Sequence, residues 1–295
     1  MSKIVTTDYA IDKIAAPSLP LAPREWDQRY QDQFANVLRL YFNRLDDFIA
    51  RLQTTSGAVD GSGIQFPNGA FYQDGYTTLT TGISNTSTAD IVVASTADFV
   101  LSTGGLLIGT EIIGYTGKTS ATFTGITRGM YGSTKAAHLA GAVVTEAQTL
   151  SSPTVALPVA LLKTTVSSGV ALDTADKTKL VFATPGIYNI QFSVQMVNYD
   201  TVIDNVTLWF RLDGTDIPYS AGVATVPAVH GGVAGTNIIS WNLVQPVTAN
   251  QYIQLLFASD TGNTVCATYP SGTAPVHPVS PSVIITATFV SALPT

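Results

Sequence analysis

The chain has 295 residues, of which 45% are hydrophobic and 12% are charged, and its formal net charge is −6. The negative charge and the lack of any run of Lys and Arg exclude nucleic-acid binding through clustered basic residues. No apolar run approaches the roughly 18 to 20 residues that cross a bilayer. Cys266 is the single cysteine, which excludes a disulfide framework, and we expect it to be a small buried hydrophobe. The first residues lack the apolar core of a signal peptide, so we expect folding in a cytoplasm.

Residues 1–25 come first, and we expect an extended anchoring arm there. The stretch APSLPLAPREW, which ends at Trp26, holds three prolines. Proline forbids a helix in this stretch and favours extended backbone. An extended arm buries little of its own surface, so its order requires a partner surface.

Residues 26–54 have helical periodicity, and we predict one long amphipathic helix. Its large apolar residues are spaced four, four and three apart, and the pattern then repeats: Trp26, Tyr30, Phe34, Val37, Tyr41, Leu45, Phe48 and Leu52. Eleven residues over three turns is about 3.67 per turn, which predicts a straight or slightly right-handed bundle. Leu38, Phe42 and Ile49 widen the stripe, which favours three helices over two. Three partners remain open for it: two copies of itself, a neighbouring protein, or the β domains of its own chain.

A change in composition near residue 55 separates this helix from the rest of the chain. Ten of the 34 charged residues lie between residues 24 and 53 and balance to zero, whereas the later sequence is poor in charge. Residues 60–150 hold short strand-like runs between Gly-containing turns, which predicts a small β-barrel or sandwich module. The runs are DIVVA (90–94), LLIG (106–109), EIIGY (111–115) and ATFTGIT (121–127). The surrounding stretch, IGTEIIGYTGKTSATFTGITRGMYGSTKAAHLAGAVV, resembles a small β domain that recurs in structural proteins of tailed bacteriophages.

Residues 151–295 have strand-like patterns throughout, and we predict an all-β sandwich with jelly-roll connections. In GIYNIQFSVQMV, apolar and polar residues alternate, which is typical of a half-buried strand. The apolar set is Tyr188, Ile190, Phe192, Val194 and Met196. Asp213-Gly214 lies between two strand-like runs and predicts a tight hairpin. The runs NIISWNLV, YIQLLFA and PSVIITATFV complete the set.

The order of these strands resembles the trimeric TNF-like jelly roll, which also forms the globular heads of complement and collagen-like proteins. The resemblance is carried by PGIYNIQFSV, a WFRLDGT hairpin, VTANQYIQLLF and a closing PSVIITATFV strand. The stretch DNVTLWFRLDGTDIPYSAGVATVPAVHGGVAG also resembles the C-terminal domain of many phage virion proteins, especially from marine phages. The resemblance covers roughly residues 155–292 and lacks the collagen repeat, whose place the helix takes. It implies a homotrimer, and with it a trimeric stalk for the helix.

The residue pattern supports no catalytic, cofactor or metal site. The histidines are far apart, and we expect surface or loop residues rather than ligands at His138, His230 and His277. The stretch from Gly129 to Lys135 reverses the order of Lys and hydroxyl that a phosphate loop needs. The acids that could act in pairs lie in turns, where Asp bonds local backbone: Asp200 and Asp204, and Asp213 and Asp216. Asp173 and Asp176 could offer oxygen ligands to calcium, but two ligands are too few for a site. The aromatic loop residues Tyr199, Tyr219 and Tyr269 pack locally or, in an adhesin, stack on sugars.

Together these features predict a non-enzymatic structural protein of a tailed-phage virion, without a cofactor, made in the host cytoplasm. We expect a homotrimeric tail-fibre or head-fibre-like appendage whose residues 1–53 bind other virion proteins of the tail or capsid. The β module would be a spacer or docking platform, and the jelly roll an outermost head that serves host attachment. The alternatives are a capsid decoration (cement) protein and an adhesin that binds a host surface glycan. We expect neither a nucleic-acid partner nor membrane insertion.

Overall fold

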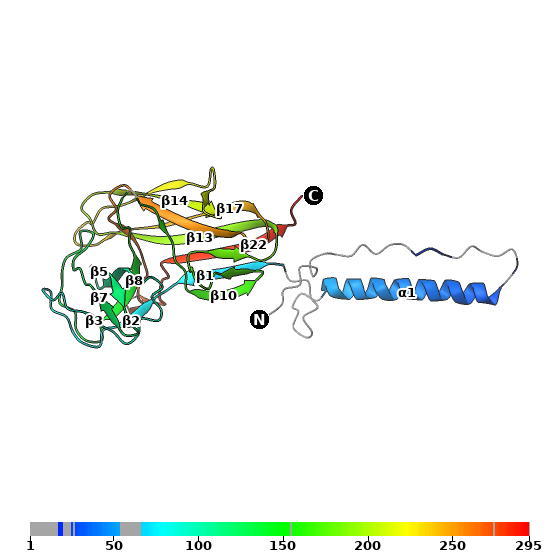
Figure 1. Ribbon diagram of the computed structural model, residues 1–295, viewed down its shortest axis with the longest axis horizontal. Helices are drawn as coiled ribbons and strands as arrows, with labels where there is room; N and C mark the ends of the chain where they lie inside the picture. Colours follow the sequence, from blue (N-terminus) through cyan, green and yellow to red (C-terminus); the bar gives the residue numbers. More distant parts are fainter. Residues whose placement is uncertain are drawn as a thin grey trace. The chain divides into compact units, whose positions relative to one another are not determined.

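The computed structural model describes residues 17–19, 25, 27–53, 66–153, 155–273 and 275–294. Within these residues the chain is mainly β, with antiparallel sheets and one helix, as predicted. It divides into two compact units, Met1–Phe66 and Pro67–Thr295 (Figure 1). Most of the predicted arm over residues 1–25, and Trp26 with it, lies outside the described residues.

The described part of the first unit contains one α-helix, α1 (Gln28–Gln53). Asp27 caps its N-terminus, because the Asp27 carboxylate accepts a hydrogen bond from the backbone N–H of Arg29 at 2.8 Å. Such a side-chain cap satisfies an N–H group that has no partner inside the helix. The helix predicted over residues 26–54 is confirmed, with each end moved inward by one or two residues.

Two large sheets form the second unit, which we call the β unit (Figure 1). The ten-stranded sheet contains, in spatial order, β10 (Lys163–Ser168), β1 (Asn68–Gln73), β22 (Val283–Ser291), β13 (Gly186–Asn198), β19 (Thr264–Ala267), β8 (Val143–Gln148), β4 (Gly104–Ile108) and β5 (Glu111–Tyr115). In the same sheet, β17 (Gly235–Val247) pairs with β13 and β2 (Tyr76–Thr78) pairs with β8. The seven-stranded sheet contains β11 (Val170–Leu172), β12 (Leu180–Phe182), β18 (Tyr252–Ser259), β14 (Asp204–Leu212) and β15 (Thr215–Asp216), with β16 (Gly222–Val226) on β14 and β9 (Leu157–Pro158) on β18.

Two small sheets complete the described part of the β unit. One contains β3 (Ile91–Val92), β7 (Thr122–Thr124) and β6 (Gly117–Lys118), and the other is the hairpin of β20 (Gly272–Thr273) and β21 (Val276–His277). The strand-like runs of the sequence lie on observed strands. EIIGY is β5 over its whole length, and GIYNIQFSVQMV fills all but the last residue of β13.

The core of the β unit falls into three clusters. The largest lies between the two large sheets and includes Phe71, Tyr188, Phe210 and Phe257. A second cluster lies inside the predicted module, and a third, smaller one joins residues from both regions. In β13 the five apolar residues of the predicted alternation are all buried, so that strand and its buried face are confirmed.

The ten-stranded sheet continues across the predicted boundary at residue 150. β8, from the module, pairs with β19, from the C-terminal region, at Gln148↔Cys266 and Ala147↔Ala267. The module thus has its own apolar cluster but shares hydrogen-bonded strands with the sandwich. Residues 67–295 accordingly belong to one compact unit.

The β unit has two distinct ends along its strands. The chain enters at Pro67, whose carbonyl accepts a hydrogen bond from the N–H of Phe289 near the end of β22, so both chain ends of the unit lie together. β13 starts at this end, where Gly186 pairs with Val247, and runs to Asn198, which pairs with β19. The module strands gather at the other end of the unit, away from the C-terminus (Figure 1).

The predicted hairpin at Asp213-Gly214 is confirmed, and it gives a first test. Leu212 pairs with Thr215, and the two loop residues have φ values of +47° and +81°. Gly214→Ala places a side chain at positive φ, so we expect it to lower the free energy of unfolding by about 1 kcal/mol. Urea unfolding followed by circular dichroism measures this cost. The neighbouring exposed variant Thr215→Ala should cost less, and equal effects would contradict the backbone explanation.

Candidate functional site

One face of α1 carries the apolar stripe that the spacing predicted. Tyr30, Phe34, Val37, Tyr41 and Leu45 are all half-buried. The rings of Tyr30 and Phe34 stack with their centroids 6.0 Å apart. Residues three and four apart lie on the same side of an α-helix, so the backbone alone brings these five side chains together.

The stripe is free of charge along its described length. Phe48 and Leu52 belong to α1 by their backbone, but their side chains, like Trp26, lie outside the described residues. The charged residues whose side chains are described within α1 are all exposed: Arg29, Asp32, Arg39, Arg44 and Asp46. Most of the stability of such a helix comes from packing its apolar face, so the stripe is a candidate protein interface.

A second uncharged surface lies on the ten-stranded sheet. The polar residues that alternate with the buried side chains of β13 point to the opposite side of the sheet, and the strand register places residues of β17 and β22 beside them. We call this set the outer face: Asn189, Gln191, Ser193 and Gln195 of β13, Ile238, Ser240, Asn242 and Val244 of β17, and Ile284, Thr286 and Thr288 of β22.

The outer face lacks charged side chains, as the centres of protein–protein interfaces do. None of its residues is charged, and Ile238, Val244 and Ile284 are 65%, 56% and 42% exposed. Free protein surface is usually rich in charged side chains, whereas the centres of interfaces are depleted in them. The outer face and the stripe of α1 therefore share the same chemical character, although they lie in separate units.

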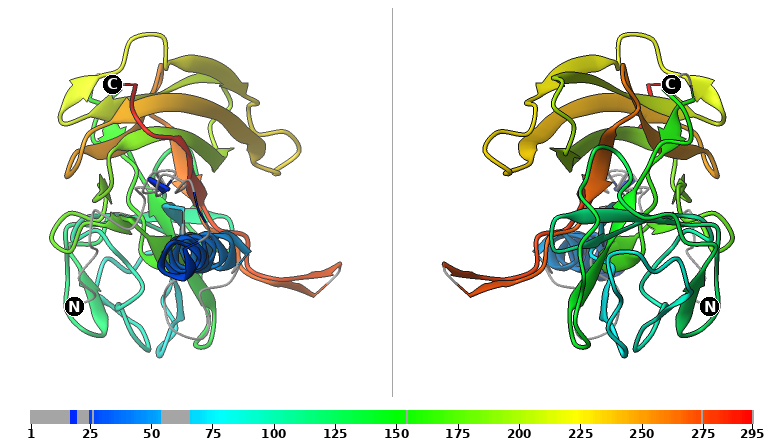
Figure 2. Two further views of the ribbon diagram at one scale, coloured as in Figure 1. Left: turned by 90° about the vertical axis from the view of Figure 1, so that its right-hand side faces the viewer. Right: turned by 90° about the vertical axis from the view of Figure 1, so that its left-hand side faces the viewer.

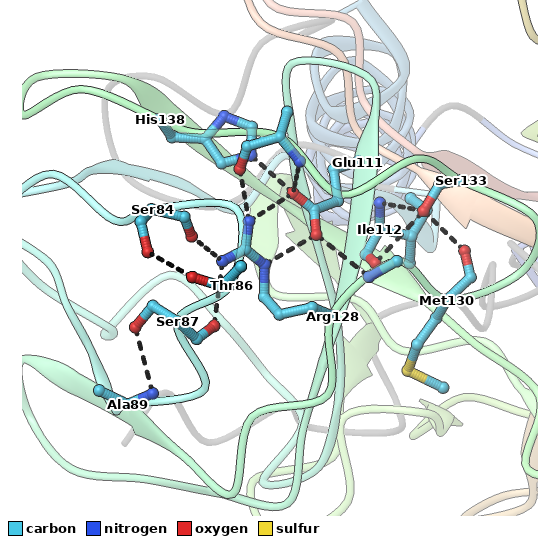
Figure 3. Close-up of polar contacts among 12 residues, drawn as sticks. Ser84, Thr86, Ser87, Ala89, Glu111, Ile112, Arg128, Met130, Ser133 and His138 are labelled. Atoms are coloured by element: carbon cyan, nitrogen blue, oxygen red, sulfur yellow. Dashed lines mark hydrogen bonds and ion pairs between the residues drawn. The ribbon is translucent and has the colours of Figure 1, made fainter.

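The small module holds a buried ionic cluster that the sequence analysis missed (Figure 3). Glu111 is the first residue of β5, and the Arg128 side chain approaches it from the segment after β7. Two parallel hydrogen bonds join them, from Arg128 Nε to Glu111 Oε1 at 2.7 Å and from Nη2 to Oε2 at 2.8 Å. Both side chains are buried, and His138 Nε2 lies 2.8 Å from Glu111 Oε2.

Every N–H of the Arg128 guanidinium has an acceptor within this cluster. Besides the two bonds to Glu111, Nη1 donates to the carbonyls of Ser84 at 2.7 Å and Ser87 at 3.1 Å, and Nη2 donates to the carbonyl of Ala136 at 2.5 Å. A guanidinium has five N–H donors, so none remains for a substrate. The cluster therefore ties loop segments to β5, and its geometry is structural rather than catalytic.

The Glu111 carboxylate is held in its ionised form. Burial alone would raise its pKa, but hydrogen bonds from Arg128, from the backbone of Ala136 and from His138 outweigh burial and lower the pKa. His138 lies in the irregular segment between β7 and β8, as expected for a loop residue, but it is not on the surface, because its side chain is 9% exposed and bonds this carboxylate. His230 and His277 are exposed, as expected.

A second buried carboxylate, Glu146 of β8, lies where the module meets the sandwich. It accepts hydrogen bonds from the backbone N–H of Val100 at 3.1 Å and from the side-chain amide of Gln73 in β1. Because burial disfavours the charged form, the pKa of Glu146 is raised to about 7. The side-chain oxygen of Gln73 has no hydrogen-bond partner among the described residues, and a half-turn of the amide would let it accept the proton of a neutral Glu146.

We expect Glu146 to make the β unit less stable as the pH rises through 7. Its folded pKa of about 7 lies above the ordinary value of 4.5. Its stabilising contribution is therefore fully present below pH 4.5 and is lost as the pH rises through 7. The difference corresponds to about 3 kcal/mol. Urea unfolding between pH 5 and 8 measures this loss. Glu146→Gln should make the free energy of unfolding nearly independent of pH in this range, whereas the surface variant Asp90→Asn should keep the pH dependence of the unaltered chain. The same pH dependence in all three proteins would contradict the assignment.

The remaining aromatic and thiol candidates do not form one site. Tyr199 and Tyr269 pack into the third core cluster, whereas Tyr219 is fully exposed with a φ of +64°. Burial raises the pKa of the Tyr199 hydroxyl, which also contacts Tyr269. Cys266 is buried as expected, and burial raises the pKa of its thiol to about 12, far from a reactive thiolate.

Asp173 bonds local backbone groups, whereas the expectation of a turn is wrong for Asp204, which is the first residue of β14 and bonds Thr264, 60 residues away. Asp173 accepts the backbone N–H groups of Ala175 and Asp176, both at 2.8 Å. Asp204 is buried and accepts a hydrogen bond from the Thr264 hydroxyl at 2.6 Å. The described part of the chain contains no group of three or more His, Cys, Asp and Glu side chains that could hold a metal ion. Nor do the described residues include a helix long and apolar enough to span a bilayer.

No protein-family model matches the chain, and no curated protein is similar to it in sequence. Two uncharged surfaces therefore remain as the candidate functional sites. These are the stripe of α1 and the outer face of the β unit, and both have the character of protein interfaces.

Proposed function

We propose that the chain is a non-enzymatic structural protein of a tailed-phage virion, working as a homotrimeric tail-fibre or head-fibre-like appendage. The observation that carries the proposal is the presence of an uncharged, partly apolar surface in each of the two units. Self-association would bury both surfaces in every copy, and obligate assemblies of this kind bury large apolar areas. Residues 1–53 would anchor the trimer to tail or capsid proteins.

The strand order of the β unit supports a TNF-like jelly roll as part of this proposal. One face of the sandwich follows the order β10–β1–β22–β13–β17, and the other follows β11–β12–β18–β14–β16. Along the chain the strands alternate repeatedly between these two sheets, and two packed antiparallel sheets connected in this way are typical of jelly rolls. The resemblance in sequence and the strand order thus favour the same trimeric head.

The position of the module changes one part of the arrangement that the sequence favours. The chain enters the β unit at the Pro67 end, next to Phe289, and the module lies at the opposite end. Measured from the point where the chain enters, the sandwich comes first and the module last. We therefore propose that the module, at the end of the β unit opposite to the point where the chain enters, is the platform for a further partner.

Light scattering on the full chain and on residues 67–295 tests the trimer. We expect the full chain, whose mass is 31.0 kDa, to form particles of three times that mass, and the shorter protein to form trimers as well. A trimeric full chain with a monomeric β unit would confine self-association to residues 1–66. Monomers in both samples would overturn the proposal.

Purified phage particles test the location. A chain that lacks residues 1–53 should remain soluble and fail to join the particle; incorporation of this truncated chain would contradict the anchor assignment. A copy number that follows capsid symmetry would favour the cement alternative over a fibre. Binding of a host glycan by residues 67–295 alone would favour the adhesin, for which Tyr199 and Tyr269 offer little because both pack into a core cluster.

A further inference from the structure

The hairpin of β20 and β21 projects from the body of the β unit. In both views of Figure 2 it extends outward as an isolated two-stranded arm. Gly272 pairs with His277 and Thr273 with Val276, and neither strand joins a larger sheet. Val276 in β21 is 86% exposed.

The root of this arm is firmly held. Tyr269 and Ser280 exchange two backbone hydrogen bonds of 3.0 Å, which close the base of the arm. The Ser280 hydroxyl donates to the side-chain oxygen of Gln195 at 3.0 Å, and Gln195 is a member of the outer face. Prolines at 270, 275 and 278 restrict the backbone further. The arm is thus a hydrogen-bonded hairpin that extends from the outer face rather than an irregular loop.

An uncharged groove in the module offers a surface of matching character. It encloses about 430 Å³, and its lining includes Leu107, Ile108, Leu139, Ala142, Val143 and Pro270. The rim is exposed, with Leu139 at 81% and Val143 at 38%. Lys, Arg, Asp and Glu are absent from its lining, which also includes His138 and Thr145, and its volume falls in the range of about 300 to 1,000 Å³ that is typical of small-molecule pockets.

We propose that the β20–β21 arm docks into this groove on a second copy of the chain. The proposal rests on the homotrimer proposed above and assigns part of its interface. Pro270, at the root of the arm, belongs to the lining of the groove, and the arm extends outward from the body of the β unit (Figure 2). Two complementary surfaces at different places on one chain make a heterologous contact, and such contacts close into rings when the rotation between copies allows it.

Three observations favour a second copy over any other occupant. Neither the groove nor the described residues of the arm carry Lys, Arg, Asp or Glu, and the titratable side chains of the two surfaces are His138 in the lining, which bonds Glu111, and His277 on the arm. The arm is continuous with the outer face through Ser280 and Gln195, and the outer face is already the proposed site of self-association. Each copy would present one arm and one groove, so every arm in a closed ring has a place to dock.

Disulfide trapping in the full chain tests the contact directly. The variant Val276→Cys/Leu139→Cys places one thiol on the arm and one on the rim of the groove, and the native Cys266 is buried and does not compete. Under mild oxidation we expect covalent dimers and trimers on a non-reducing gel. The matched control Val276→Cys/Val223→Cys uses an equally accessible residue of β16, 70% exposed, and should give no such ladder.

Each result of this trapping has a meaning. A ladder with the arm–groove pair alone supports the proposal. No ladder in a sample that light scattering shows to be trimeric overturns the docking but leaves the proposed trimer intact. A monomeric sample overturns the trimer and the docking together. Equal ladders with both pairs indicate random collision and also count against the docking.

A charge placed on the arm gives an independent measurement. Val276→Asp in the full chain would carry a carboxylate into the groove, and we expect it to raise the concentration at which the trimer dissociates by about tenfold or more. Val223→Asp, which adds the same charge to exposed β16, should leave that concentration unchanged. Equal dissociation of the two variants would overturn the docking.

Discussion

Replacing Arg128 with alanine is expected to lower the free energy of unfolding by about 3 to 5 kcal/mol, the usual cost of removing one partner of a buried ion pair. Arg128 and Glu111 are both buried, so the variant would leave a carboxylate without its counter-charge. The carbonyls of Ser84, Ser87 and Ala136 would lose their donor at the same time. This is a large part of the roughly 5 to 15 kcal/mol that holds a typical domain folded. Urea unfolding at neutral pH measures the loss.

A matched control for Arg128 exists on the surface of the same unit. Arg211 bonds Asp216 at 2.8 Å, but the two side chains are 28% and 56% exposed. Arg211→Ala should therefore cost less than about 1 kcal/mol. Hydrogen exchange at the N–H groups of Gly129 and Ala136, which donate to Glu111, should accelerate in Arg128→Ala alone. Equal destabilisation by the two variants would contradict the role assigned to the buried cluster.

Placing two carboxylates on the stripe of α1 is expected to abolish the association of the helix. The variant Phe34→Asp/Tyr41→Asp replaces two half-buried aromatic side chains with carboxylates. Burying one large apolar side chain stabilises an assembly by about 1.5 to 3 kcal/mol. The helix should then lose its partner and most of its helicity, because amphipathic helices depend on the packing of their apolar face. The helical part of the circular dichroism spectrum and the light-scattering mass of the full chain measure both effects.

The control for the stripe adds the same charge elsewhere on α1. Asn36 and Asn43 are exposed, and neither lies three or four residues from a residue of the stripe, so Asn36→Asp/Asn43→Asp adds two carboxylates on the opposite side of the helix. We expect this variant to keep the helical signal and the mass of the unaltered chain. If the stripe variant also keeps both, the stripe has no partner in the assembled protein.

The sequence predicted well those features that depend on residues close together in the chain. The alternation over Tyr188 to Met196 predicted β13 and its buried face, and Asp213-Gly214 predicted a turn with two positive φ values. The spacing from Tyr30 to Leu45 predicted a helix and one common face. In each case the backbone period alone decides which side chains lie together.

The features that the sequence did not predict depend on contacts between distant residues. Glu111 lies 17 residues from Arg128 and 27 from His138, and only the path of the intervening loops brings them together. A lone glutamate at the start of the apolar run EIIGY was the available signal, because a carboxylate beside buried residues needs a partner. Likewise, the pairing of β8 with β19 depends on register across more than a hundred residues, which no local pattern contains.

The shared position of Pro67 and Phe289 determines how the β unit would carry a pulling force. A load applied where the chain enters, against a partner held at the module end, acts lengthwise along β1. β1 is paired with β10 from Asn68 to Tyr72, and with β22 at Gln73. Hydrogen bonds between antiparallel strands are perpendicular to the strands, so such a load shears them and they must fail together rather than unzip one by one. The order of the chain through the sandwich thus favours resistance to extension between Pro67 and the module end of the β unit.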